Sequence, residues 1–104
     1  MKIVKVSYTT KIEFVEQNKI NIKNVMRELQ QLNHSGINYN ACLASDNKTF
    51  IHTAFFKTDE DQKLLNEIPA FKIFQEQLRA SGLESAPKQE LLSLVDSSVS
   101  IFDL

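Results

Sequence analysis

Residues 37–57 read INYNACLASDNKTFIHTAFFK, which places two alternating segments on either side of a polar turn. Apolar side chains recur at every second position from Ile37 to Leu43 and again from Phe50 to Phe56, which is the period of a β-strand. The four residues between the segments, 45–48, are polar and suit a hairpin turn. We therefore predict two antiparallel strands, 37–44 and 49–57, and both faces of the second are largely apolar.

The chain before this hairpin predicts one strand and one long helix. Residues 2–9 alternate as a strand does, and 11–33 carry an apolar stripe at helical spacing. Thr10 and Glu13 have the spacing of a capping box at the start of this helix. Gly36 lies close enough to its far end to help terminate it.

The chain after the hairpin predicts two further helices and a last strand. Residues 58–61 begin a helical region that runs to about residue 66. Pro69 disfavours the α conformation at Ile68, so a new helix begins there, with the proline in its first turn, and ends at Gly82. Pro87 closes the linker that follows. The last strand is predicted from residue 90 to about residue 101.

The predicted order is β-α-β-β-α-β, an α+β fold of the ferredoxin-like type. In this fold a four-stranded antiparallel sheet carries both helices on one face, and 104 residues fit a single domain, 1–104. The other face of the sheet is then an apolar surface without a cover. We predict that a second copy covers it, giving a homodimer through the sheet face. The alternative is that the end of the chain folds over this face.

Composition excludes several classes of partner. The formal net charge is -1 and the basic residues are scattered, which argues against nucleic acid. No apolar run is long enough for a membrane-spanning helix. Cys42 is the only cysteine and cannot form an intramolecular disulfide, so we expect a cytoplasmic protein. We interpret Cys42 itself as a small buried hydrophobe.

Two segments carry a family resemblance: FVEQN at 14–18 and IPAFKIFQ at 68–75. They resemble small bacterial proteins related to the antibiotic-biosynthesis monooxygenases, in the dimeric α/β-barrel superfamily. The resemblance extends from the first strand to Val95. It implies a ferredoxin-like fold and a homodimer in which two sheets close into a barrel. It also implies chemistry, because characterised relatives include oxygenases that act on aromatic or quinol substrates without metal or flavin.

His52 is the residue predicted to be catalytic. It lies in the middle of a strand on a face that is otherwise apolar, and a histidine exchanges its proton near neutral pH. It could serve as the general base that deprotonates a phenol-like substrate before the substrate reacts with oxygen. The alternative is a core histidine with both ring nitrogens hydrogen-bonded.

Seven further residues are predicted to bind a ligand. Asn18 and Asn21 lie on or beside the apolar stripe of the first helix, where an amide must be hydrogen-bonded to a ligand or to the protein itself. Tyr8 and Tyr39 could present hydroxyl groups to a pocket with aromatic walls, formed by Phe56, Phe71 and Phe74. These aromatic residues could equally be ordinary core residues. No metal site and no cofactor are expected.

Three functional hypotheses follow. The first is a cofactor-independent monooxygenase, or a related enzyme, that acts on a small aromatic or quinol-like molecule. The second is a non-catalytic dimer that binds a small molecule or is purely structural, in which Phe71, Phe74 and Leu78 leave no cavity. The third is haem degradation, which is disfavoured because the chain has no tryptophan, whereas several enzymes of the resembled group place one in the pocket.

Overall fold

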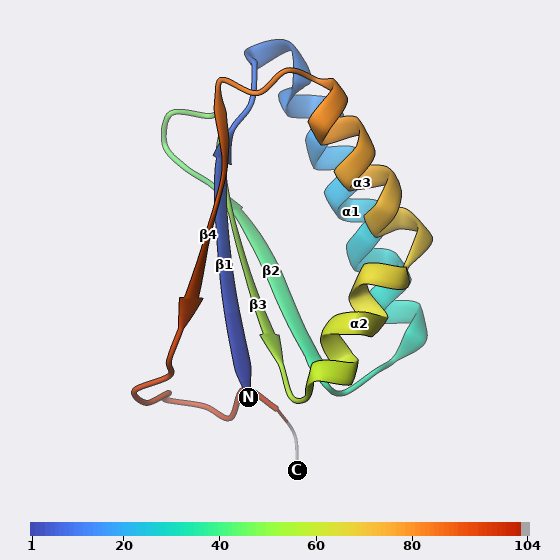
Figure 1. Cartoon of the computed structure of the whole chain (residues 1–104), viewed down its shortest axis with the longest axis vertical. Coiled ribbons are helices and arrows are strands. Elements are labelled where there is room, and N and C mark those ends of the chain that lie inside the picture. The colour runs from blue at the N-terminus through green and yellow to red at the C-terminus, as the bar shows by residue number, and fades with distance from the viewer. Residues whose placement is uncertain (103–104) are drawn as a thin grey trace.

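The computed structural model describes residues 1–102 and has the predicted ferredoxin-like fold. Its strands pair antiparallel in the order β2-β3-β1-β4. The helices lie side by side on one face of this sheet, as Figure 1 shows. In chain order the elements are β1 (Lys2–Thr9), a short 3-10 turn (Ile12–Phe14), α1 (Val15–Leu32), β2 (Ile37–Leu43), β3 (Thr49–Phe56), α2 (Asp59–Glu67), α3 (Pro69–Ala80) and β4 (Ser85–Leu92).

The hairpin of β2 and β3 follows its sequence pattern closely. Every second residue of β3, from Phe50 to Phe56, is buried, and the residues between them are half-buried. The buried set faces the helices and forms the core with Val25, Phe74 and Leu78 from α1 and α3. Alternation therefore predicted the strand, and the structure shows which of its two apolar faces the helices cover.

Local chemistry also explains the break between α2 and α3. Thr58 and Asp61 form a reciprocal capping box at the start of α2. Ile68 is extended, with a ψ angle of 124°, and Pro69 occupies the first position of α3. The proline thus fixes the predicted bend between the two helices.

The start of α1 and the residue that terminates it differ from the prediction, whereas the helix ends at the predicted position. Thr10 is completely buried, caps no helix, and its backbone N–H donates to the Lys48 carbonyl at 3.0 Å. The helix begins only at Val15. It ends at Asn33, whose left-handed φ of 51° stops the helix before Gly36 is reached.

The last strand was predicted in the wrong place. It spans Ser85–Leu92 rather than 90–101, and Pro87 lies inside it. β4 is an edge strand, so a proline without an N–H is tolerated there, and the pairing with β1 is irregular between Ser7 and Thr9. Because β4 is mostly exposed and polar, it lacks the alternation that marks a half-buried strand.

The residues after β4 reach the sheet face that the helices leave open. The chain runs across one end of the sheet (Figure 1), and the Asn38 amide donates to the Ile101 carbonyl at 3.3 Å. Ile3, on this face, is buried. Cys42 also lies on this face and is exposed, so the expectation of a buried cysteine was wrong. None of the helices in residues 1–102 combines the length and apolar character that a membrane crossing requires.

One close contact ties the loop before β2 to α2. The His34 ring hydrogen-bonds the Asp61 carboxylate, which lowers the pKa of Asp61. A Cβ atom added to the buried Gly36 would lie 2.5 Å from that carboxylate. Glycine is therefore required at position 36 by the space available.

We expect Gly36→Ala to lower the free energy of unfolding by about 1–3 kcal/mol, because the methyl group must displace Asp61 from its cap. Urea unfolding measures this, with Ser35→Ala at the exposed neighbouring position as the control. Equal stability of the two variants would contradict the proposed steric conflict.

Candidate functional site

Sheet register brings two tyrosines to the ring of His52. On β1, Val6 pairs with His52 and Tyr8 pairs with Phe50, so Tyr8 is a diagonal neighbour of the histidine. On β2, Tyr39 pairs with Ala54, which makes it the diagonal neighbour on the other side. Long side chains reach across such diagonals. His52, on the strand between β1 and β2, therefore meets a hydroxyl group on each side.

Four side chains form one continuous chain of hydrogen bonds. The Asn18 amide nitrogen, from α1, donates to the Tyr8 hydroxyl at 2.9 Å. The Tyr8 hydroxyl lies 2.7 Å from His52 Nε2, and the Tyr39 hydroxyl lies 2.6 Å from His52 Nδ1. We call this set, Asn18, Tyr8, His52 and Tyr39, the relay.

The direction of the relay depends on the tautomer of His52, because each neutral tautomer leaves one tyrosine hydroxyl proton without an acceptor in the described part of the chain. In one tautomer Tyr8 is the donor to the ring. Tyr8 accepts from Asn18, and within residues 1–102 its own proton has His52 Nε2 as its acceptor. A neutral imidazole has one donor and one acceptor, so Nδ1 then carries the proton and donates to Tyr39. The Tyr39 hydroxyl proton is left at the end of the relay, without an acceptor among the described residues.

Burial keeps every member of the relay uncharged at neutral pH. His52 is 5% exposed, and burial lowers its pKa from 6.5 to about 4. Burial raises the pKa of both Tyr8 and Tyr39 well above the ordinary 10, although the hydrogen bond from Asn18 partly offsets this at Tyr8. The resting histidine is therefore a neutral hydrogen-bonding group.

The burial of Asn18 costs free energy of folding. Its side chain is fully buried, and its Oδ1 atom has no hydrogen-bond partner within the described residues. An unpaired buried acceptor costs about 1–3 kcal/mol. The amide nitrogen nevertheless ties α1 to the relay through Tyr8.

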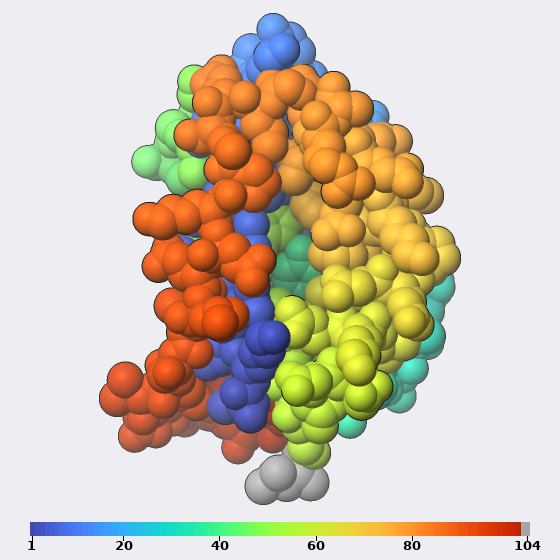
Figure 2. All heavy atoms as spheres, in the orientation of Figure 1, coloured from blue at the N-terminus to red at the C-terminus, as the bar shows by residue number. Residues whose placement is uncertain are grey.

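A cavity of about 150 Å³ lies beside the relay, between the sheet and helices α2 and α3. Figure 2 shows the surface hollowed between β1 and β4 on one side and these helices on the other. Four of the predicted site residues line this cavity: Tyr39, His52, Phe56 and Phe71. The Tyr39 hydroxyl, where the relay ends, therefore belongs to a residue of the cavity wall.

The other predicted site residues lie elsewhere. Asn18 and Tyr8 belong to the relay behind the cavity. Asn21 donates to Gln77 at 2.7 Å and accepts from Gln17 at 3.0 Å, so it ties α1 to α3. Phe74 packs against the His52 ring, with the two ring centres 5.4 Å apart.

Four polar cavity residues were missed by the sequence prediction, in addition to the aliphatic residues of the wall. They are amides at the rim: Gln62, Asn66, Gln75 and Gln89. Gln62 and Asn66 are four residues apart and share one side of α2, and Gln75 lies one turn after Phe71 on α3. The three helix amides could have been predicted, because their spacing places them beside buried apolar positions. Gln89 could not, because its position depends on the correct bounds of β4.

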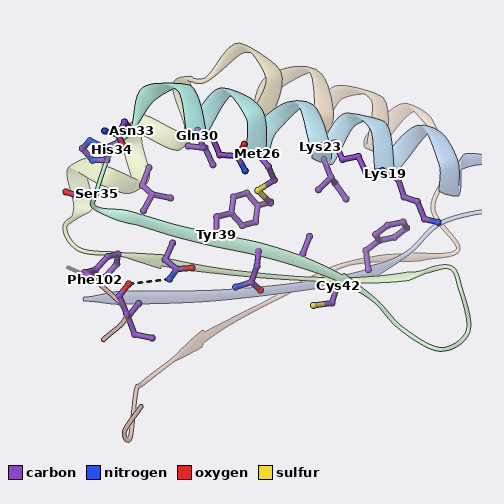
Figure 3. Close-up of a pocket in the computed structure, with 18 of the residues that line it drawn as sticks. Lys19, Lys23, Met26, Gln30, Asn33, His34, Ser35, Tyr39, Cys42 and Phe102 are labelled. Carbon is purple, nitrogen blue, oxygen red and sulfur yellow. Dashed lines mark hydrogen bonds between the residues drawn. The ribbon is translucent and has the colours of Figure 1, made fainter. Parts of the chain in front are cut away.

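A larger groove runs along the outer edge of β2. It has a volume of about 890 Å³, and all residues from Ile37 to Leu43 line it. Figure 3 shows Met26 and Tyr39 pointing toward each other between α1 and β2, while Cys42 lies on the other side of the strand. The groove thus wraps around a strand edge, and His52 does not line it. Residues 1–102 hold no group of three or more histidine, cysteine, aspartate or glutamate side chains that could hold a metal ion.

Solved structures of similar fold cover almost the whole chain. One is named antibiotic biosynthesis monooxygenase; it is 11% identical, the match covers 92% of this chain and 100% of that one, and the TM-score is 0.76. A candidate antibiotic biosynthesis monooxygenase from Nitrosomonas europaea is 15% identical, with 92% and 100% covered and a TM-score of 0.75. A conserved protein from Methanosarcina mazei is 16% identical, with 88% and 92% covered and a TM-score of 0.70.

These similarities establish the fold. At such low identity the same fold carries many activities. Neither a protein-family model nor a curated protein sequence matches the chain.

The low pKa of His52 predicts acid sensitivity. An unfolded histidine binds a proton below about pH 6.5, whereas folded His52 does so only near pH 4, so the unfolded state binds more protons between these values. We expect His52 to contribute about 3 kcal/mol of stability at neutral pH, all of which is lost as the pH falls to 4. Urea unfolding between pH 7 and 4 measures this. If His52→Gln shows the same pH dependence as the wild type, His52 does not have a depressed pKa.

Proposed function

We propose that this protein binds a small phenolic molecule in the cavity beside Tyr39 and His52 and oxidises it with dioxygen, as a monooxygenase. The observation that carries the proposal is the end of the relay. The Tyr39 hydroxyl is hydrogen-bonded to His52 Nδ1, and Tyr39 is a residue of the cavity wall, so its oxygen can exchange a proton with both a ligand hydroxyl and the ring. Some proteins of similar fold are named monooxygenases, which supports the same class of reaction for this protein.

The relay offers a route for the phenolic proton. The substrate hydroxyl gives its proton to the Tyr39 oxygen as Tyr39 passes its own to His52 Nδ1. This transfer begins from the opposite tautomer, in which Nε2 carries the ring proton and donates to Tyr8. His52 is thus the general base, acting through Tyr39.

Moving the phenolic proton to His52 costs free energy. A phenol has a pKa near 10 and His52 one of about 4, so complete transfer costs about 8 kcal/mol. A turnover of about 10 per second corresponds to a barrier of about 16 kcal/mol. Ionisation through the relay therefore leaves about half of such a barrier for the reaction with oxygen.

The overall reaction balances with dioxygen as co-substrate. For a hydroquinone, one oxygen atom enters the ring to give a hydroxyquinone, and the other leaves as water. The substrate supplies all four electrons that reduce dioxygen. The ionised ring, rich in electrons, is the species that reacts with oxygen.

A non-catalytic role is the second candidate. One observation favours it: both ring nitrogens of His52 are already hydrogen-bonded by tyrosine hydroxyls, as in an ordinary satisfied core histidine. In this case the cavity binds a small molecule, and the relay only stabilises the core.

We further propose that the protein is a homodimer joined through its open sheet face. This face carries half-buried Ile51 and Phe55, and Leu92 on it is 41% exposed. Val95 and Val99, in the segment that follows, are 99% and 72% exposed. A second copy would cover these apolar side chains.

Light scattering tests the dimer. We expect a dimer for the wild type and a monomer for Phe55→Asp, because a carboxylate in the interface would have no partner. Ile73→Asp, at a half-exposed position on the outer side of α3, is the control and should remain dimeric. A monomeric wild type would contradict the proposal.

Oxygen uptake with hydroquinone tests catalysis. We expect one dioxygen consumed per hydroquinone, and a loss of kcat of at least about 100-fold in Tyr39→Phe and in His52→Gln, because both interrupt proton transfer. Ile73→Ala, far from the cavity, should keep the wild-type rate. Binding without any enzymatic oxygen uptake would favour the non-catalytic candidate.

A further inference from the structure

The cavity limits the size of its ligand. Its volume is about 150 Å³. A protein cavity of about this volume is known to hold a single benzene ring. Phe56 and Phe71 in its wall suit the faces and edges of one aromatic ring. A fused system of two or three rings would extend beyond this volume.

The rim limits the charge of the ligand. Four carboxamides belong to the residues that line the cavity: Gln62 and Asn66 from α2, Gln75 from α3 and Gln89 from β4. None of the residues that line the cavity is an acid, a lysine or an arginine, and His52 is neutral at pH 7. A ligand ion would therefore lose hydration without meeting an opposite charge.

The amide groups at the rim are available to hydrogen-bond a ligand. An amide both donates and accepts, so it can bond a hydroxyl, a carbonyl or another amide. The amide groups that hold other side chains belong to Gln17, Asn18, Asn21 and Gln77. The four rim amides are not among them.

We infer that the ligand of this site is an uncharged, single-ring phenol with a second neutral hydrogen-bonding group on the ring. The phenolic hydroxyl meets Tyr39, the ring fills the apolar part of the cavity, and the second group bonds the rim amides. Gln62 and Gln75 thereby determine specificity. This inference rests on the proposed function for the position of the phenolic hydroxyl.

Binding to the full-length protein at pH 7, followed by amide NMR shifts, tests the inference. The panel is phenol, 4-hydroxybenzamide, 4-hydroxybenzoate and the tricyclic anthrone. We expect 4-hydroxybenzamide to bind about tenfold more tightly than phenol, since neutral hydrogen bonds of this kind are worth up to about that factor. The benzoate should bind at least about tenfold more weakly than the benzamide, and anthrone should not enter the cavity.

Two variants show whether the rim amides cause the preference. In Gln75→Leu and in Gln62→Leu, the preference for 4-hydroxybenzamide over phenol should shrink to less than about threefold, with phenol affinity kept. Gln30→Leu, an exposed amide position on α1 away from the cavity, is the matched control. Melting temperatures confirm that each variant is folded.

The outcomes separate the inference from the proposed function. Equal or tighter binding of the benzoate or of anthrone overturns the inference, as does an unchanged benzamide preference in both leucine variants. The predicted binding order without oxygen uptake on hydroquinone supports the inference as a statement about the ligand and rejects the monooxygenase.

Discussion

The neutral ring of His52, hydrogen-bonded on both sides, is the constraint on which this core depends. A buried imidazole is tolerated only when both nitrogens are paired. The pairing needs Tyr8 and Tyr39 at diagonal positions on the neighbouring strands, so it couples the register of β1, β2 and β3. Asn18 extends this coupling to α1. One polar chain thus joins the side chains of one helix and of three strands whose backbones are already paired in the sheet.

The cavity follows from the way that the second helical segment is divided. Pro69 ends the α conformation at Ile68, so α2 and α3 are separate helices with separate capping. Both contribute amides to the rim, while Phe71 of α3 supplies apolar wall. The relay ends at this wall. A tyrosine hydroxyl bonded to His52 and an uncharged, ring-sized space therefore lie together, which is the arrangement that the proposed phenol oxidation would use.

Local sequence patterns predicted most of the helices and strands. The hydrogen bonds of the site depend on how the strands pair, which these patterns do not specify. Alternation in 37–57 identified the hairpin, and Ile68 before Pro69 located the break between the helices. His52 and the asparagines stood out because they are polar on apolar faces. Tyr8 and Tyr39 hydrogen-bond the same histidine because of the strand register, and a single sequence does not specify that register. β4 was misplaced because an exposed edge strand carries no alternation, and Gln89 was missed with it.

The protonation of His52 is the most direct test of this account. Nitrogen-15 NMR of the labelled imidazole distinguishes the two neutral tautomers from the charged ring. We expect a neutral ring at pH 6 and no protonation until the pH approaches 4. A charged ring at pH 6 would contradict the neutral imidazole on which both the packing of the core and the proposed proton transfer depend.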